Sequence, residues 1–238
     1  MKEHIKKIFN LLGLDIRYYN SFSVFGKQLE HILHCNHINL VLDVGANTGQ
    51  YADGLFRSGY RGRIVSFEPL KKAHKALTAK AEKNQSWLVA PRMAIGHVNG
   101  EIEINISGNS VSSSVLGMNE SHLSAAPQSI YIGKEKVEIK RLDDAAKQYF
   151  KEDSVAFIKL DVQGFEKQAL EGAADILDLV KGIEVELSTV ALYQGQSLAR
   201  ELMEIIMNNG FDLWGLNPIL YDPKTGRLLQ YDGVFIKK

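Results

Sequence analysis

Short apolar segments alternate with longer amphipathic segments along most of the chain. Five of the apolar segments have the length and composition of strands buried in a sheet: 40–44, 63–67, 87–95, 155–160 and 182–187. Apolar residues recur at helical spacing in the segments near 48–58, 70–83, 164–179 and 197–209. This alternation is typical of a doubly wound α/β domain, whose ligands bind beyond the carboxyl ends of its parallel strands.

The two ends of the chain depart from this alternation. Two further apolar segments, 211–216 and 228–237, follow the last predicted helix, and the turn-rich sequence NPILYDPKTG separates them. We therefore predict a mostly parallel seven-stranded sheet with an antiparallel closing pair. Helical spacing near 2–12 and 22–36 predicts an N-terminal helical extension over 1–37, so that the main domain occupies 38–238.

A polar, serine-rich insertion interrupts the domain at about 107–133. It lies between predicted strands at 101–106 and 136–141 and contains the sequence GNSVSSSVLGMNESH. Loops of this length inside a compact domain are usually either functional or disordered. We predict a mobile lid over the binding site, and a disordered surface insertion is the alternative.

A glycine-containing loop follows the first predicted strand. The sequence VLDVGANTGQY, residues 41–51, places two glycines after an aspartate, which allows a sharp turn and leaves room for a ligand at the start of a helix. The dinucleotide fingerprint G-x-G-x-x-G and the phosphate-binding P-loop are both absent, so a pyrophosphate ligand is disfavoured. Glu68 ends the second predicted strand, 19 residues after Gly49, where a carboxylate can accept both hydroxyls of a ribose.

Five motifs follow one another along the chain: DVGANTGQY, SFEP, MAIG, LDD and IKLDVQGFEKQALEGA. They resemble the successive motifs of the FkbM-type S-adenosylmethionine-dependent methyltransferases over about residues 38–190. The resemblance implies a Rossmann-like class I methyltransferase fold and methyl transfer to an oxygen, commonly a hydroxyl of a sugar, a glycan precursor or a secondary metabolite. The most usual family sequence carries an acidic residue where Gln163 stands.

The predicted cofactor is S-adenosylmethionine, because the loop and Glu68 suit a ribose that carries no pyrophosphate. The expected site consists of residues at the ends of the central strands: Asp43, Gly45, Asn47, Gly49, Glu68, Asp161 and, near the adenine ring, Ala94 or Ile95. The alternative is that the glycines only turn the chain and that Glu68 only caps the helix after Pro69.

Asp161 is the first candidate for the chemistry, because it ends the fourth predicted strand and Lys159 lies two residues earlier on the same face. Asp161 could act as a general base, ligate a divalent ion or hold the ammonium group of the cofactor, and all three roles stay open. Glu186, near the carboxyl end of the fifth strand, is a second candidate. His122 in the serine-rich insertion could take a proton from the acceptor, and an exposed loop histidine is the alternative.

Charge and composition limit the partners. The 238 residues include 28 basic and 28 acidic side chains, which leaves no net charge to attract nucleic acid. The single cysteine excludes an internal disulfide, and no apolar segment reaches the roughly 18 residues of a membrane span. We expect a cytoplasmic protein without stable membrane insertion that acts on a small-molecule or glycan acceptor. A homodimer and a divalent metal both stay open.

Two other functions fit parts of the pattern. An NAD-dependent oxidoreductase uses a similar sheet, but the missing third glycine and the antiparallel pair disfavour it. A domain that binds a nucleoside or a partner protein without turnover is the other alternative, since a fold does not fix a function.

Overall fold

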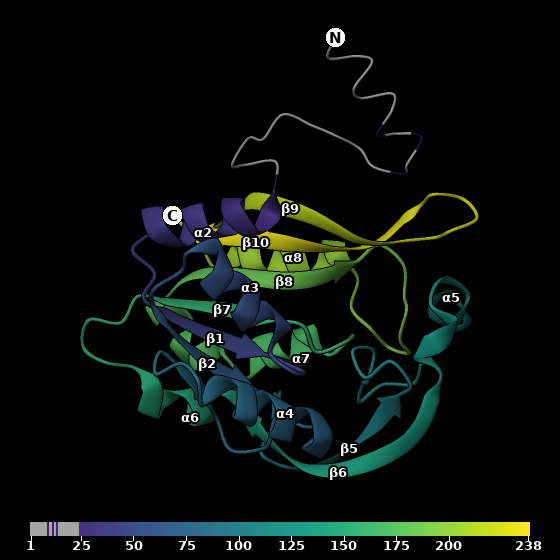
Figure 1. The fold of residues 1–238 in the computed structure, drawn as a ribbon, viewed down its shortest axis with the longest axis horizontal. Coiled ribbons are helices and arrows are strands. Elements are labelled where there is room, and N and C mark those ends of the chain that lie inside the picture. The colour runs from purple at the N-terminus through teal and green to yellow at the C-terminus, as the bar shows by residue number, and fades with distance from the viewer. Residues whose placement is uncertain (1–8, 10, 12, 14–23) are drawn as a thin grey trace.

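The computed structural model describes residues 9, 11, 13 and 24–238 (Figure 1). The helix predicted near 2–12 lies outside these residues apart from Phe9 and Leu11. The second predicted helix, near 22–36, is α2, Phe25–Cys35, and its buried face shares a core cluster with strands of the main sheet.

Seven strands form the main sheet, in the order β3-β2-β1-β7-β8-β10-β9. Their bounds are β1 Leu40–Val44, β2 Arg63–Phe67, β3 Trp87–Val89, β7 Ala156–Leu160, β8 Val180–Ser188, β9 Phe211–Tyr221 and β10 Leu228–Lys237. The pairs among β3, β2, β1, β7 and β8 are parallel, whereas β10 is antiparallel to both β8 and β9. The predicted fold class, a mostly parallel sheet with an antiparallel closing pair, is confirmed.

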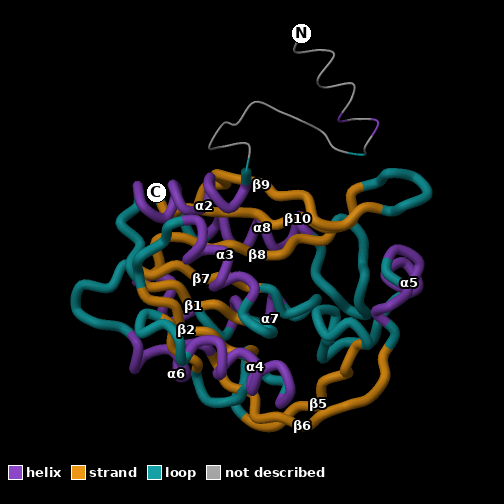
Figure 2. The backbone as a smooth tube through the Cα atoms, viewed as in Figure 1, coloured by secondary structure: helices purple, strands orange, loops and turns teal. Residues whose placement is uncertain are grey.

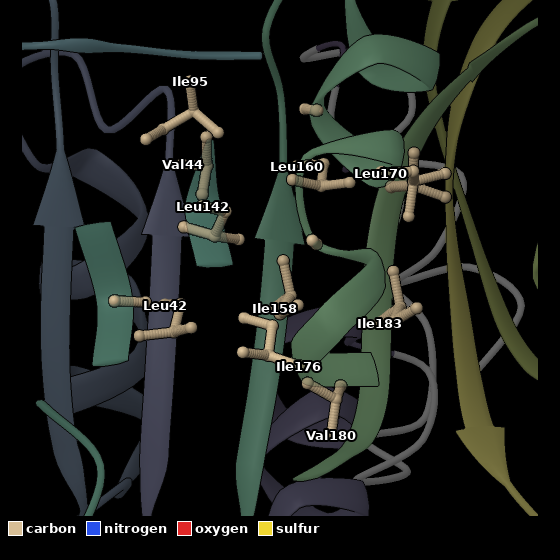
Figure 3. Packing of buried hydrophobic residues seen from close by; sticks show 14 of the residues in the cluster. Leu42, Val44, Ile95, Leu142, Ile158, Leu160, Leu170, Ile176, Val180 and Ile183 are labelled. Carbon is tan, nitrogen blue, oxygen red and sulfur yellow. The ribbon is translucent and has the colours of Figure 1, made fainter. Parts of the chain in front are cut away.

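Helices cover both faces of this sheet, because successive residues of a strand point to opposite sides. Val41 of β1 belongs to the core cluster on one face and Leu42 to the cluster on the other, part of which is drawn in Figure 3. The first face carries α2, α3 and α4, and the second carries α6, α7 and α8. The helix bounds are α3 Gln50–Ser58, α4 Lys71–Ala81, α6 Leu142–Ala146, α7 Glu166–Glu171 and α8 Ala199–Asn208.

A second, three-stranded sheet has the order β4-β6-β5, with β4 Ala94–Gly96, β5 Gly100–Ser107 and β6 Tyr131–Arg141. The single strand predicted over 87–95 is therefore wrong, because β3 ends at Val89 and β4 belongs to the other sheet. Pro91 lies between them, and a proline has no N–H with which to continue a ladder.

The helix predicted over 164–179 is also two elements, α7 and a 3₁₀ helix, Ala174–Leu179. Gly172 separates them, and a Cβ at this position would come within 1.9 Å of the Gly96 carbonyl oxygen. The close approach of β4 therefore requires glycine here, and glycine is a poor helix residue. Apolar spacing along the chain could not reveal this tertiary contact.

Hydrogen bonds give the serine-rich segment a defined conformation that includes the short helix α5, Glu120–Ala125. The side chain of Asn109 accepts from Ser107 Oγ at 2.7 Å and donates to Ser112 Oγ at 3.0 Å and Ser129 Oγ at 2.9 Å. Figure 2 shows the loops at the carboxyl ends of the central strands facing β5, β6 and α5. Within the described ranges, no helix is long and apolar enough to cross a bilayer.

Candidate active site

The loop after β1 brings the ends of three strands together. Gly45 has a φ of 82°, and a Cβ there would lie 1.8 Å from the Asp161 carbonyl oxygen, so only glycine fits. The backbone N–H of Asn47 donates to Glu68 Oε2 at 2.8 Å. The carboxyl ends of β1, β2 and β7 therefore meet at this loop.

A cavity of about 480 Å³ opens beside the loop, a volume in the usual range for small-molecule sites. Apolar side chains line the part next to the second sheet, among them Leu70, Met93, Ala94, Ile95, Ile104 and Phe165. Polar side chains line the part at the ends of β7, β8 and β10, among them Lys159, Asp161, Gln163, Glu184, Glu186, Gln230 and Asp232. Residues 109–115 of the serine-rich segment form a further wall.

Two residues of the predicted cofactor site do not line this cavity. Asp43 is fully buried, where its Oδ2 accepts from Ser66 Oγ at 2.9 Å, and Ser66 Oγ in turn accepts from Trp87 Nε1 at 3.0 Å. Gly49 faces the Trp87 ring, which a Cβ would approach to 2.5 Å. Their positions are thus explained by packing behind the loop, whereas Gly45 and Asn47 face the cavity.

Glu68 lies on the cavity wall with both carboxylate oxygens engaged. Oε2 accepts from the Asn47 N–H and Oε1 accepts from the Leu70 N–H, each at 2.8 Å. Burial raises the pKa of Glu68 to about 7, against the opposing effect of the two backbone N–H groups. Each oxygen has a second acceptor position, so the side chain can bind further hydroxyl donors from the cavity.

Lys159 and Asp161 form an ion pair at the end of β7. Lys159 Nζ lies 3.1 Å from Asp161 Oδ2 and 3.8 Å from Asp43 Oδ1, and 5.3 Å above the centre of the Tyr51 ring. Burial alone would lower the pKa of Lys159, but the carboxylates of Asp161 and Asp43 outweigh it and raise that pKa above its ordinary value. The lysine is therefore a fixed positive charge beneath the cavity.

Further carboxylates lie at the ends of β8 and β10. Glu184 accepts from the Tyr51 hydroxyl at 2.5 Å, and Glu186 accepts from Gln230 Nε2 at 2.8 Å. Burial raises the pKa of Glu184 to about 8 and that of Glu186 well above its ordinary value, with neighbouring carboxylates adding to both effects. Asp232 pairs in register with Glu186 and has a pKa raised by burial to about 6.

Sequence reasoning missed Tyr51, Gln230 and Asp232. The apolar pattern predicted the strand that carries Gln230 and Asp232, but the pairing of this strand with β8 is a tertiary property. Tyr51 is the last residue of the sequence VLDVGANTGQY and lies in the first turn of α3. Its place next to the glycine loop was the only sign in the sequence that it could reach the site.

His122 is a buried residue rather than an exposed loop histidine, with 3% of its surface accessible. It lines the cavity, its ring meets the Tyr193 ring edge-on at 5.1 Å, and its Nδ1 has no hydrogen-bond partner. Burial lowers the pKa of His122, which favours the neutral imidazole. Across residues 24–238 and the three isolated described positions, no three His, Cys, Asp or Glu side chains are grouped to hold a metal ion.

Comparison with known proteins places this site in a family. A model of the methyltransferase FkbM domain matches residues 43–213. The chain is 28% identical over 176 residues to the 2-O-methyltransferase NoeI of Sinorhizobium fredii, and the match covers 70% of each protein.

Two solved structures are also similar. The methyltransferase FkbM of Methylobacillus flagellatus has 15% identity and a TM-score of 0.49, over 82% of this chain but 43% of that one, so the present chain spans less than half of it. The fibrillarin of Aeropyrum pernix with bound S-adenosyl-L-methionine has 10% identity and a TM-score of 0.46, over 83% of this chain and 66% of that one. Since the family model spans well over half of the sequence, the protein belongs to the FkbM family of S-adenosylmethionine-dependent methyltransferases.

Proposed function

We propose that the protein transfers a methyl group from S-adenosylmethionine to a hydroxyl of a sugar, a glycan precursor or a secondary metabolite. The observation that carries the proposal is that Glu68, Asp161 and Glu186 line one cavity at the carboxyl edge of the sheet. The name of the 28% identical relative, a 2-O-methyltransferase, supports oxygen as the acceptor atom.

The residues present fit this cofactor. Glu68 keeps one free acceptor position on each carboxylate oxygen for the ribose hydroxyls, and Ala94, Ile95 and Phe165 offer an apolar surface to the adenine. Gly45 leaves the loop backbone open to the ligand at the point where it meets Asp161. When bound, S-adenosylmethionine supplies an electrophilic methyl group on its sulfonium.

Asp161 is assigned to the cationic end of the cofactor. Its side chain lines the cavity beside the loop that carries Gly45, and Lys159 Nζ pairs with Oδ2 at 3.1 Å. A carboxyl group held in place by this ion pair is suited to a charge-assisted hydrogen bond with an ammonium group. In this assignment Lys159 has a structural role, because its ammonium group holds the Asp161 carboxylate in place.

Glu186 is assigned as the proton acceptor. Burial and the neighbouring carboxylates raise its pKa, which makes its ionised form a stronger base for a hydroxyl proton. The amide groups of Gln163 and Gln230 both donate to Oε2, at 3.0 and 2.8 Å, and hold the carboxylate in one orientation. His122 is the second candidate for this role, because its imidazole is neutral and also lines the cavity.

The charges on the cavity wall limit the acceptor. Among the described lining residues, five are acidic, namely Glu68, Asp161, Glu184, Glu186 and Asp232, and Lys159 is the one lysine or arginine. Lys159 is already paired with Asp161, so none of these described lining residues offers an unpaired lysine or arginine to a phosphate or a carboxylate. An acceptor that is neutral near the methylated hydroxyl is therefore favoured.

Two measurements test the proposed function. Isothermal titration with S-adenosylmethionine, S-adenosylhomocysteine and NAD should give binding of the first two, and binding of NAD alone would establish the oxidoreductase alternative instead. Labelled methyl transfer to neutral sugars and to their phosphorylated forms should then favour the neutral acceptors. Equal transfer to phosphorylated sugars would contradict the charge argument.

Asp161→Asn should weaken S-adenosylmethionine binding by about 1.5 to 3 kcal/mol, roughly 10- to 150-fold, because it removes the charge of a charge-assisted hydrogen bond. Titration calorimetry measures this directly, with Asp153→Asn in an exposed loop as the control that leaves affinity unchanged. If turnover falls far more than affinity, Asp161 acts as a base or metal ligand. Loss of wild-type activity in a chelator, restored by magnesium, would then identify the metal role.

The serine-rich segment at about 107–133 is proposed to close over the acceptor. Ser110 to Ser114 line the cavity, and Ser110 Oγ contacts Asn47 Nδ2 across it at 3.4 Å. Amide hydrogen exchange in this segment should therefore slow when S-adenosylhomocysteine and an acceptor are both bound. Identical exchange with and without the ligands would show a fixed wall rather than a lid.

A further inference from the structure

Gln163 lies in the turn after β7 in an unusual backbone conformation. Its φ is +54°, in the left-handed region that glycine favours, and Gly164 follows with a φ of +94°. The carbonyl oxygen of Gln163 accepts from Ser114 Oγ at 2.6 Å. The serine-rich segment thus holds this turn in place and directs a side chain with 9% exposure toward the cavity.

The side-chain amide of Gln163 uses all of its hydrogens. Nε2 donates to Asp161 Oδ1 at 2.6 Å and to Glu186 Oε2 at 3.0 Å, which joins the ends of β7 and β8. Oε1 accepts from the Tyr193 hydroxyl at 2.5 Å. The reverse orientation would direct the amide oxygen at two carboxylates, so this arrangement is the stable one.

Tyr193 fixes the amide from the opposite side. Its side chain is fully buried, and its backbone N–H donates to Gln196 Oε1 at 3.2 Å. Because the hydroxyl donates to Gln163 from this rigid position, the amide has no freedom to turn away from the carboxylates.

We propose that Gln163, held by Tyr193, is a positioning residue that fixes the orientations of Asp161 and Glu186 and lets both carboxylates face the cavity without sharing a proton. The proposal rests on the proposed function, in which Asp161 holds the cofactor and Glu186 accepts the proton. A neutral group with two donors is suited to this place, because a third carboxyl group here would have to bind a proton or repel both neighbours.

Several titratable groups other than Asp161, Glu186 and Tyr193 lie around Gln163. Lys159 on β7, Glu166 on α7 and Asp232 on β10 act electrostatically on Glu186, which Gln163 contacts. Glu184 on β8 and His122 on α5 line the same cavity as Gln163. Acidic groups predominate, so a carboxyl group introduced at position 163 would have a pKa above its ordinary value.

Gln163→Met tests the positioning, because methionine has a similar size and donates no hydrogen bond. S-adenosylhomocysteine affinity should fall about tenfold, because Asp161 loses one of its two partners. Tyr193→Phe should lower S-adenosylhomocysteine affinity about two- to threefold, because Gln163 loses the hydroxyl that holds its amide. Gln168→Met, at a part-buried glutamine of α7 that does not line the cavity, should leave the affinity unchanged.

The pH dependence of the stability of Gln163→Glu tests whether a neutral residue is needed between Asp161 and Glu186. The introduced carboxyl group should have a higher pKa in the folded protein than in the unfolded chain. As pH rises between these two pKa values, the unfolded chain ionises first, so the free energy of unfolding decreases. The unfolding midpoint should fall relative to wild type by about 3 °C or more between pH 5 and pH 8. The midpoint difference for Gln163→Met should not change with pH.

The outcomes separate this inference from the proposed function. If the wild type fails to bind S-adenosylhomocysteine, the cofactor assignment itself is refuted. If the wild type binds it and Gln163→Met binds it equally well, or loses only thermal stability, the positioning role is overturned. A Gln163→Glu midpoint difference that is the same at pH 5 and pH 8 would overturn the separation of the carboxylates.

Discussion

Glu186→Gln is expected to lower methyl-transfer turnover about 100-fold or more, while S-adenosylmethionine affinity changes by only a few-fold. The substitution keeps the shape of the side chain but removes the base, and general-base catalysis commonly contributes about 10²- to 10⁴-fold. Single-turnover transfer of a labelled methyl group measures the effect. Glu138→Gln, at an exposed carboxylate of β6, is the matched control.

The pH dependence of turnover gives an independent check on Glu186. Burial raises its pKa above the ordinary value, and the base must be ionised, so wild-type turnover should rise with pH through that raised pKa. Because Glu184 and Asp232 lie nearby, the observed midpoint belongs to the group of carboxylates together. Wild-type-like turnover in Glu186→Gln would transfer the role to another residue, with His122 first.

Glu68→Ala should weaken S-adenosylmethionine binding by about 1.5 to 3 kcal/mol, roughly 10- to 150-fold, through the loss of hydrogen bonds from the ribose to a charged group. Glu68 also accepts from the N–H groups of Asn47 and Leu70, so a part of the loss comes from a looser loop. Titration calorimetry measures the affinity, and Glu82→Ala at the exposed end of α4 is the control.

The pKa of Glu68 adds a second test. Since burial raises it to about 7, wild-type cofactor affinity should increase as pH rises through about 7 and the carboxyl group ionises. Glu68→Ala should not show this increase. Unchanged affinity in the variant would remove Glu68 from the ribose site.

The alternation of apolar and amphipathic segments was enough to predict the fold. Strands such as β1 and β7 are buried on both faces, so they appear as continuous apolar segments in the sequence. The loop motif and the position of Glu68 were also readable, because a glycine and a carboxylate at strand ends follow from local chain geometry. These features predicted a site at the carboxyl edge of the sheet, where the cavity lies.

Local pattern could not distinguish motif residues that line the cavity from motif residues that pack behind it. Gly45 and Gly49 have the same φ of 82°, yet one faces the Asp161 backbone and the cavity and the other faces Trp87. Asp43 similarly lies behind the loop, where Ser66 Oγ donates to its Oδ2 and Lys159 Nζ lies 3.8 Å from its Oδ1, although burial still raises its pKa. Whether a motif residue faces the cavity or packs behind the loop depends on which residue of another strand lies next to it.

The sequence by itself therefore determined most strands of the main sheet, most of the helices, the order of the motifs and the edge of the sheet at which the cavity lies, because these depend on local periodicity and chain direction. The tertiary structure alone decided the arrangement of the carboxylates. Gln163, Glu186 and Gln230 meet because β7, β8 and β10 are neighbours in one sheet, and Tyr193 reaches Gln163 from a loop. Burial by these neighbours raises the pKa of Glu186, and burial is a property of the folded chain.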